Sequence, residues 1–499
     1  MPLFTQAELE DIQGLLLSEW VHLRRSKYYF LRVLDITKAK QWLKDLMPFI
    51  TTAANFPANP AERASKLPKV VNIAFTHAGV VALGLPEEGQ YSFGREFIYG
   101  MAARKTVLGD KGVNAPENWV VGGPKNPEIH ILLSLDALDE AAMAELVKDM
   151  KTIIDVEGDD GVEIVHEENG FRHPAEKEAF GWLDGISQPH VQRMPGYPED
   201  IPNVCATGEF ILGYINEAGV YPPSPWLNPE HDPNNILPTL PKETKQLAGK
   251  KDFGLRGSYI VYRKLYQDVA GFWNFMDGVS RNPDGTRNIE KAVFLASKMV
   301  GRWPSGTPFA LSPDKDTPEI GKDENRRDAF LYHADDADGY KTPVASHIRR
   351  TNPRDSRFRE PDPTFSLSSS DKHRLIRRTV FYGEKDIFPR ENVEKLDIPE
   401  NIVDDGNDRG SQFFALNANI RSQFEFVQVA WSNNEVFDGL KNSRDPIGGV
   451  GGTSFEIPAK PARILIKDVP QFIQVRGGAY FFLPSMTALR YLAETPASV

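Results

Sequence analysis

The sequence predicts a two-domain protein of mixed α and β structure, and three observations lead to this prediction. A chain of 499 residues is too long for one typical domain and long enough to bury two cores. Segments with the periodicity of strands alternate with segments that have the periodicity of helices. Long irregular stretches rich in proline connect these elements. Together these observations favour an α+β or an α/β fold.

The first half opens with a helix and continues with alternating elements. Thr5 and Glu8 form a capping-box pattern ahead of apolar residues, which predicts a helix over residues 5–17. Runs rich in β-branched and aromatic residues predict strands; they lie at residues 28–36, 69–76, 128–137 and 162–168. Amphipathic patterns predict helices; they lie at residues 39–53 and 138–154.

The second half repeats this alternation, without an exact internal sequence repeat. Strands are predicted at residues 257–265 and 411–418, and helices at residues 267–276 and 420–432. The last predicted element is a hairpin-like pair of strands at residues 472–484, around Gly477 and Gly478.

The domain boundary is predicted within a stretch dense in proline and asparagine, residues 221–250. We therefore expect one domain at residues 1–225 and a second at residues 226–499. Another irregular excursion, residues 304–346, precedes the most informative part of the chain.

The composition excludes several classes of function. Hydrophobic residues at 40% and charged residues at 25% are typical of a soluble protein, and no run of about 18 apolar residues predicts a membrane span. The formal charge of −11 argues against nucleic acid or an anionic membrane as the main partner. Cys205 is the only cysteine, so an intramolecular disulfide framework and a cysteine-ligated cluster are excluded. The acidic N-terminal segment does not resemble a signal peptide, so we expect a cytoplasmic protein, with export by another route left open.

Three segments combine a charged residue with glycine or proline in an apolar setting, as loops do when they present a polar group inside a pocket. They are EAFGWLDGISQPHV (178–191), TPVASHIRRTNPRD (342–355) and DKHRLIRRTVFYG (371–383). Each has a plainer interpretation when taken alone. An Asp before Gly is usually a turn former, a single His is usually structural, and paired arginines usually form a solvated surface.

Taken together, these segments resemble those of the dye-decolorising peroxidases. GWLDGISQP resembles the Gly-x-x-Asp-Gly motif of that family, and SHIRRTNPRD resembles the segment with its haem-ligating histidine. Further similar segments follow in the same order along nearly the whole chain, among them VNIAFTHAG (71–79), GEFILGY (208–214), GRWPSGTP (301–308) and RGGAYFFLPS (476–485). The resemblance is to the larger members, of the fungal and cyanobacterial subclasses.

The resemblance implies a fold and a cofactor. It implies an α+β protein of two ferredoxin-like domains with antiparallel sheets, in a dimeric α+β barrel-like architecture within one chain, instead of a doubly wound parallel sheet. It also implies haem b (iron protoporphyrin IX), bound mainly by the C-terminal domain, whereas the N-terminal domain carries the Gly-x-x-Asp-Gly motif.

The resemblance also implies residues on the proximal side of the haem. His347 matches the ligand of the iron, and an acceptor carboxylate on its second nitrogen would increase its basicity. Asp445 matches this carboxylate, with Glu425 as the alternative. Arg349 is expected to bind a haem propionate. His333 is the strongest rival to His347 as the ligand.

On the distal side, Asp184 matches the catalytic aspartate, which moves a proton between the oxygens of peroxide. Arg377 matches the distal arginine, which stabilises negative charge on peroxide. Arg378 stays open as the alternative, although Arg377 directly follows the apolar pair Leu375 and Ile376. Gly185 and Phe413 are also expected at the haem, and Phe413 has core packing as its alternative role.

The expected activity is reduction of hydrogen peroxide to water, coupled to one-electron oxidation of dyes, phenols and other aromatic donors. Because an aspartate is the acid and base, we expect turnover to be favoured at acidic pH. Bulky dyes would react at the haem edge or through a surface radical, for which the 8 Trp and 15 Tyr are candidates. The main alternative is a non-catalytic haem carrier or iron-handling protein on the same scaffold, and a cofactor-free hydrolase is a weaker one. The oligomeric state stays open.

Overall fold

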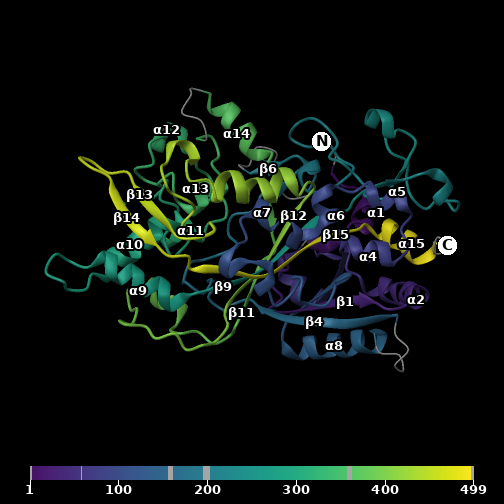
Figure 1. Cartoon of the computed structure of the whole chain (residues 1–499), viewed down its shortest axis with the longest axis horizontal. Helices are drawn as coiled ribbons and strands as arrows, with labels where there is room; N and C mark the ends of the chain where they lie inside the picture. The colour runs from purple at the N-terminus through teal and green to yellow at the C-terminus, as the bar shows by residue number, and fades with distance from the viewer. Residues whose placement is uncertain (1–2, 58, 155–160, 195–202, 357–361, 496–499) are drawn as a thin grey trace.

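The computed structural model describes residues 3–57, 59–154, 161–194, 203–356 and 362–495. Its main feature is one large sheet with helices around it (Figure 1). No helix in the described ranges is long and apolar enough to span a membrane.

The strands of the first half form a four-stranded antiparallel unit in the order β4-β1-β3-β2. They are β1 (Arg25–Val33), β2 (Lys69–Phe75), β3 (Ile131–Ala137) and β4 (Val162–Phe171). The principal helices of this half are α2 (Ile36–Leu46) and α8 (Glu140–Ile154), each of which directly follows a strand. This connectivity and strand order are those of a ferredoxin-like unit.

The second half repeats this arrangement with β11-β12-β9-β15. The strands are β9 (Ser258–Gln267), β10 (Ile376–Arg377), β11 (Val380–Tyr382), β12 (Gly410–Asn417) and β15 (Ile473–Leu483). β10 and β11 pair with successive parts of β12. The helical elements of this half are α9 (Val269–Ser280), α10 (Ile289–Val300), α13 (His347–Thr351), and two consecutive π-helical segments, Arg421–Glu425 and Val427–Ser432.

The two halves join edge to edge at both sides. β4 pairs with β11 through Phe171 and Phe381, and β2 pairs with β15 through Phe75 and Phe482. Because every strand of this sheet except the two-residue β10 then has at least two neighbours, the sheet closes into a barrel. The expected α+β fold with two ferredoxin-like halves and antiparallel pairing is therefore confirmed. The expected boundary between residues 225 and 226 lies in the connection between the halves, and it stays a prediction.

Short elements fill the connections and the ends of the barrel. The helices are α1 (Gln6–Asp11), α3 (Arg63–Lys66), α4 (His77–Ala82), α5 (Glu87–Tyr91), α6 (Arg95–Ala103), α7 (Lys105–Leu108), α11 (Pro318–Gly321), α12 (His333–Asp336), α14 (Pro363–Asp371) and α15 (Met486–Glu494). The short strands are β5 (His190–Val191), β6 (Val204–Cys205), β7 (Trp226–Leu227), β8 (Lys251–Asp252), and the hairpin strands β13 (Thr453–Ile457) and β14 (Ile464–Val469).

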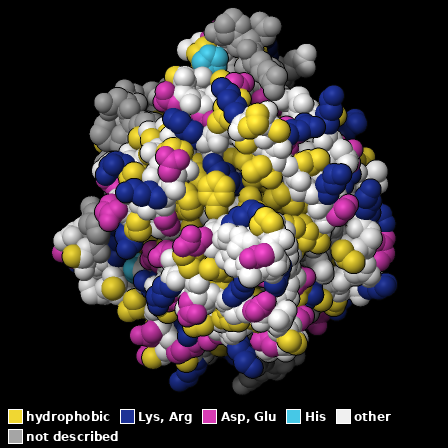
Figure 2. Space-filling view, turned by 90° about the vertical axis from the view of Figure 1, so that its left-hand side faces the viewer, with side chains coloured by type: hydrophobic (Ala, Val, Ile, Leu, Met, Phe, Trp, Pro, Cys, Tyr) yellow, Lys and Arg dark blue, Asp and Glu magenta, His cyan; other side chains and the backbone are white. Residues whose placement is uncertain are grey.

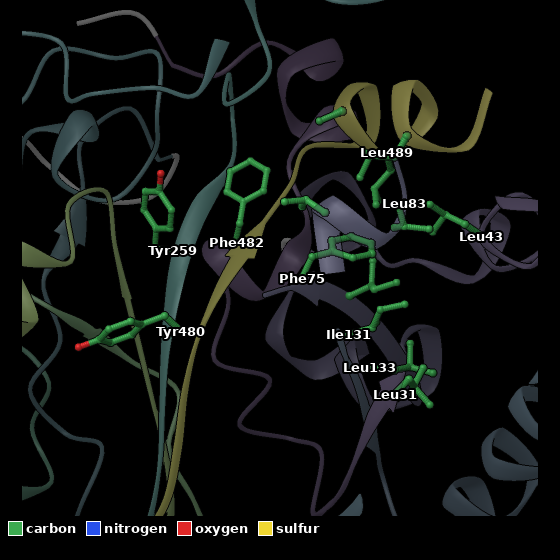
Figure 3. Close-up of a cluster of buried hydrophobic side chains, with 14 of the residues drawn as sticks. Leu31, Leu43, Phe75, Leu83, Ile131, Leu133, Tyr259, Tyr480, Phe482 and Leu489 are labelled. Atoms are coloured by element: carbon green, nitrogen blue, oxygen red, sulfur yellow. The ribbon is translucent and has the colours of Figure 1, made fainter. Parts of the chain in front are cut away.

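Strand alternation divides the buried side chains into two clusters. One strand face turns Tyr28, Phe30, Tyr262 and Phe414 into the barrel. The opposite face packs under the helices in the second cluster, in which both halves meet (Figure 3); it includes Leu31, Leu133, Phe75, Phe482 and Leu489.

Two predicted elements differ most from the structure, whereas the helix expected at residues 39–53 is shorter, since α2 ends at Leu46, and the helix expected at residues 420–432 is π-helical. The helix expected at residues 5–17 has the predicted Thr5–Glu8 capping box but ends at Asp11, because the Gln13 amide is drawn into the core, where it donates to the Ile73 and Pro484 carbonyls. The hairpin expected at residues 472–484 is one continuous strand with a bulge at Arg476, next to Gly477. Val121 packs against this glycine at a distance that leaves no room for a side chain, so the glycine marks a close approach and not a turn.

The end of the molecule with α9, α10 and the β13–β14 hairpin presents a hollow with hydrophobic side chains gathered at its centre (Figure 2). Charged side chains of both signs surround it on this face. The face therefore has no extended area of a single charge.

Candidate active site

A cavity of about 340 Å³ lies on the outer face of the sheet in the second half. Alternate residues of β9 face it, namely Arg263, Leu265 and Gln267, whereas Tyr262, just before Arg263, points into the barrel. β12 contributes Ser411 and Phe413, and β15 contributes Ile473 and Val475. The opposite walls come from α13, the π-helical segments and the loop at residues 178–189. A cavity of this size and largely apolar lining is typical of a small-molecule or cofactor site.

His347 enters this cavity at the start of α13. The hydroxyl of the preceding Ser346 donates to the Lys298 carbonyl, which anchors α13 to α10. The His347 Nδ1 lies 2.8 Å from the Asp445 Oδ2, and Asp445 is almost fully buried. Because a carboxylate only accepts hydrogen bonds, Nδ1 carries the proton and the Nε2 lone pair is left for a metal ion.

The Asp445 carboxylate is held in an ionised state. Its Oδ1 accepts the backbone N–H groups of Ile447 and Gly448. Burial raises the pKa of Asp445, but His347 and these N–H groups outweigh burial and leave the pKa below its usual value. Burial lowers the pKa of His347, yet the adjacent carboxylate outweighs this effect and raises the pKa overall. Asp445 and His347 therefore form a strongly coupled pair.

The alternative acid, Glu425, lies elsewhere. It accepts both Arg104 Nε and Nη2, and the Tyr480 hydroxyl also donates to it. Of the two acids considered from the sequence, Asp445 is the one in contact with the His347 ring.

Asp184 and Arg377 line the same cavity, although almost two hundred residues separate them in the chain. Asp184 lies in a loop and precedes Gly185, whose φ of 75° is in the left-handed region that favours glycine. The Arg377 Nη1 is 3.9 Å from the Asp184 Oδ1, and each side chain is 32% exposed. The charges of both residues act on the pKa of His347, so the three groups share one electrostatic environment. Gly185 itself does not line the cavity.

Arg378 points away from the cavity. Its Nε donates to the Leu15 carbonyl at 2.9 Å and its Nη2 to the Leu16 carbonyl at 3.2 Å, at one end of the barrel. Adjacent residues in extended backbone point to opposite faces, so only one of the two arginines can face Asp184. The structure places Arg377 there.

Arg349 is a correction to the sequence analysis, because it does not line the cavity. It is 1% exposed, and its Nη1 donates to the Asp336 and Thr342 carbonyls. Two residues along a helix turn a side chain about 200° away, so Arg349 leaves α13 on the side opposite to His347. Its hydrogen bonds therefore stabilise the irregular segment at residues 304–346.

Of the other residues considered from the sequence, some line the cavity and others lie outside it. The predicted Phe413 lines the cavity, and so does Trp182. His333 lies outside it, in α12, and its backbone N–H donates to Asp355. In the described part of the chain, no group of three or more His, Cys, Asp and Glu side chains could hold a metal ion.

Several polar residues of the cavity were not predicted from the sequence. Glu178 lines it with a pKa that burial raises, although the backbone N–H groups of Trp182 and Phe180 partly oppose this effect. Arginines also line it, together with His373, namely Arg263, Arg302, Arg354 and Arg374. For Arg263, the one available signal in the sequence was its position as a charged residue within the largely apolar pattern of β9, SYIVYRKLYQ.

Comparisons with known proteins agree with this architecture. The family model of the DyP dimeric alpha+beta barrel domain matches residues 11–170. The chain is 28% identical to a dye-decolorizing peroxidase of Mycena epipterygia over 97% of this chain and 87% of the relative. It is also 28% identical to the multifunctional dye peroxidase DyP2 of an Amycolatopsis species, over 97% of this chain and 96% of the relative.

Solved structures give the same result for nearly the whole chain. An ancestral D-type dye-decolorizing peroxidase superposes with a TM-score of 0.76 at 27% identity, covering 97% of this chain and 98% of the other. A dye-decolorizing peroxidase in complex with 2,6-dimethoxyphenol superposes with a TM-score of 0.73 at 26% identity, covering 97% and 99% of the two chains.

Proposed function

Because the chain belongs to the dye-decolorising peroxidase family, whose members are haem enzymes, we propose that the cavity in its second half holds haem b and reduces hydrogen peroxide. The observation that carries the proposal is the convergence of Asp184, Arg377 and His347, from three distant segments, on one cavity. A carrier would need His347 but not an acid and a cation facing it.

The residues present fit a haem. His347 offers the Nε2 lone pair and is oriented by Asp445, as a ligand of iron requires. Leu265, Phe413 and Val475 provide an apolar wall for the ring system. Arg354 and Arg374 line the cavity, unlike Arg349, and their positive charge would suit the two propionates. When bound, haem supplies the iron that binds peroxide and the electrons that reduce it.

Asp184 and Arg377 have distinct roles in this proposal. The Asp184 carboxylate accepts the proton from one oxygen of hydrogen peroxide and returns it to the other oxygen, which leaves as water. The Arg377 guanidinium, which is always charged, stabilises the negative charge on peroxide after that proton has left. Their separation of 3.9 Å places both groups within reach of one small molecule.

The reducing substrates are proposed to be dyes and phenols. The relatives are named for dye decolorisation, and one related structure contains 2,6-dimethoxyphenol. The cavity is too small to take a bulky dye beside a haem, so we propose electron transfer at the edge of the haem or through a surface aromatic residue.

The test is the absorption spectrum of haem-loaded protein before and after one equivalent of hydrogen peroxide. The wild type should change its Soret band within the mixing time, and Asp184→Asn should change it roughly 10²- to 10⁴-fold more slowly. Asp335→Asn removes an exposed acid outside the cavity and should match the wild type. A wild-type protein that binds haem but does not respond to peroxide would favour the carrier.

A further inference from the structure

Beside the cavity, the buried carboxylate of Asp328 accepts hydrogen bonds from three side chains. The Asp328 Oδ1 accepts the Ser187 hydroxyl at 2.8 Å, Arg302 Nη2 at 2.8 Å and Arg354 Nη2 at 3.2 Å. We call these four residues the Asp328 cluster. Both arginines are about 5% exposed, and the Asp328 side chain is 13% exposed.

The Asp328 cluster is fixed by further contacts. Arg302 also donates to the Gly306 and Arg327 carbonyls, and Arg354 to the Asp328 and Phe330 carbonyls. The two guanidinium groups lie 5.6 and 3.9 Å from the centre of the Phe330 ring. Burial raises the pKa of Asp328, but the two arginines outweigh burial and lower it, so the carboxylate stays charged. A buried charge with this many partners keeps one position.

Ser187 connects this fixed point to the distal pair. Its backbone carbonyl accepts Arg377 Nη2 at 3.0 Å, and the next side chain, Gln188, accepts the Arg377 backbone N–H at 2.9 Å. The guanidinium group is thus hydrogen-bonded to the loop, whereas Asp184 lies 3.9 Å away, beyond direct hydrogen-bond distance. Without this tether, the opposite charges would approach until they formed a close ion pair.

We propose that Asp328, acting through Ser187, is a positioning residue that holds Arg377 apart from Asp184 and so maintains the space in which peroxide is bound. The proposal rests on the proposed peroxidase function. A close ion pair would occupy the lone pairs of Asp184 that accept the proton, and it would turn the guanidinium away from the peroxide. Neither Asp328 nor Ser187 needs to touch peroxide for this effect.

The experiment compares Ser187→Ala with Ser187→Thr in the haem-loaded protein. Alanine removes the donor to Asp328 but keeps the backbone carbonyl, whereas threonine restores a hydroxyl. For Ser187→Ala, kcat/KM for peroxide should fall roughly tenfold to a hundredfold, and KM for the phenol donor should not change. Ser187→Thr should recover most of the rate. Ser280→Ala removes another buried serine hydrogen bond, to the Asp277 carbonyl at the end of α9, and should match the wild type.

A second readout does not depend on activity. A crystal structure of Ser187→Ala should show Arg377 and Asp184 at direct hydrogen-bond distance. If the peroxide rate of Ser187→Ala equals that of the wild type, or if the rate falls while the separation stays at its wild-type value, the positioning role is wrong. Asp328→Asn provides an independent variant that should reproduce both effects.

Failure of this inference is distinguishable from failure of the proposed function. If the wild type itself does not react with peroxide, the peroxidase proposal fails. If the wild type reacts, Asp184→Asn is slow and Ser187→Ala is normal, only the positioning role fails.

Discussion

The two halves of the barrel have the same strand order, yet they use the outer face of the sheet differently. In the first half, Tyr29, Leu31 and Leu133 on this face are completely buried, in the cluster that also contains residues of α2 and α8. Figure 1 shows α8 alongside the strands of this half. In the second half, the corresponding face of β9 and β12 carries Arg263, Gln267 and Ser411 and opens onto the cavity.

The position of the helices accounts for this difference. α2 and α8 follow their strands closely and lie directly on the sheet. In the second half, α9 and α10 pack around Trp273, which stacks on Trp182 at a ring distance of 5.6 Å, in a cluster of their own. The same topology therefore gives a filled core when the helices lie on the sheet, and a binding cavity when they lie beyond its edge.

The largest expected effect is loss of haem from the second half, which contains the cavity. We expect His347→Ala to abolish most haem binding, because the variant loses the only histidine side chain that the described residues place at Asp445. His333→Ala, in α12 outside the cavity, should bind haem like the wild type. The measurement is the ratio of Soret to protein absorbance after reconstitution, and the opposite result for the two variants would reassign the ligand.

Arg377 and Arg378 provide a matched pair within the same half. Arg377→Leu should slow the reaction with peroxide roughly 10²- to 10³-fold, because it removes a charge at the reacting oxygen. Arg378→Leu should leave that rate nearly unchanged but lower the free energy of unfolding by about 2 kcal/mol, because the buried Leu15 and Leu16 carbonyls lose their donor. Stopped-flow kinetics and urea unfolding separate these effects. A slow Arg378→Leu would show that Arg378 also acts on peroxide.

Local patterns in the sequence were sufficient for most strands but not for the residues at the centre of the site. The resemblance selected His347, Asp184 and Arg377, and strand alternation would have favoured one arginine of the adjacent pair in any case. Arg349 was misplaced because the start of α13, and hence the direction of each of its side chains, could not be located from SHIRRTNPRD.

Long-range contacts could not be predicted in this way. Asp328 lies in an irregular excursion and has no motif, and its role depends on Ser187, Arg302 and Arg354, which approach it only in the folded chain. The Gln13 amide that ends α1 finds its acceptors at Ile73 and Pro484, far along the sequence. In both cases a buried polar group is satisfied by distant partners, and no local pattern encodes them.

The comparison of the two halves also predicts a difference in stability. Leu133→Ala should lower the free energy of unfolding by about 3 kcal/mol, because it leaves a cavity in the packed first half. Phe413→Ala should cost about 1 kcal/mol in the haem-free protein, since its ring already faces an open cavity. Urea unfolding of the haem-free variants measures both values. Equal losses would mean that the second half closes its cavity when no haem is bound.

A further modest effect is expected from a buried acid in the connection that leads into the second half. Glu209 is 4% exposed, and burial raises its pKa from 4.5 to about 7. Its backbone carbonyl accepts the Ala418 N–H and the Gln423 side-chain amide, so it anchors the start of the π-helical segments. Between pH 4.5 and 7 the folded protein keeps a proton that the unfolded chain releases, so the free energy of unfolding falls as the pH rises through this window.

If the whole shift of the Glu209 pKa contributed, the free energy of unfolding would fall by about 3 kcal/mol. Because local rearrangement around the charged form offsets part of this, the expected loss is about 1 to 2 kcal/mol. Glu209→Gln lacks this titrating proton, so its free energy of unfolding should fall less than that of the wild type over the same window, and at pH 8 it should be the more stable protein. Glu230→Gln, at an exposed position of the same connection, should keep the wild-type pH dependence. Urea unfolding at pH 5 and pH 8 tests this prediction. An unchanged slope in Glu209→Gln would mean that Glu209 is already ionised at pH 5 and that the connection into the cavity half is more open to water than the structure shows.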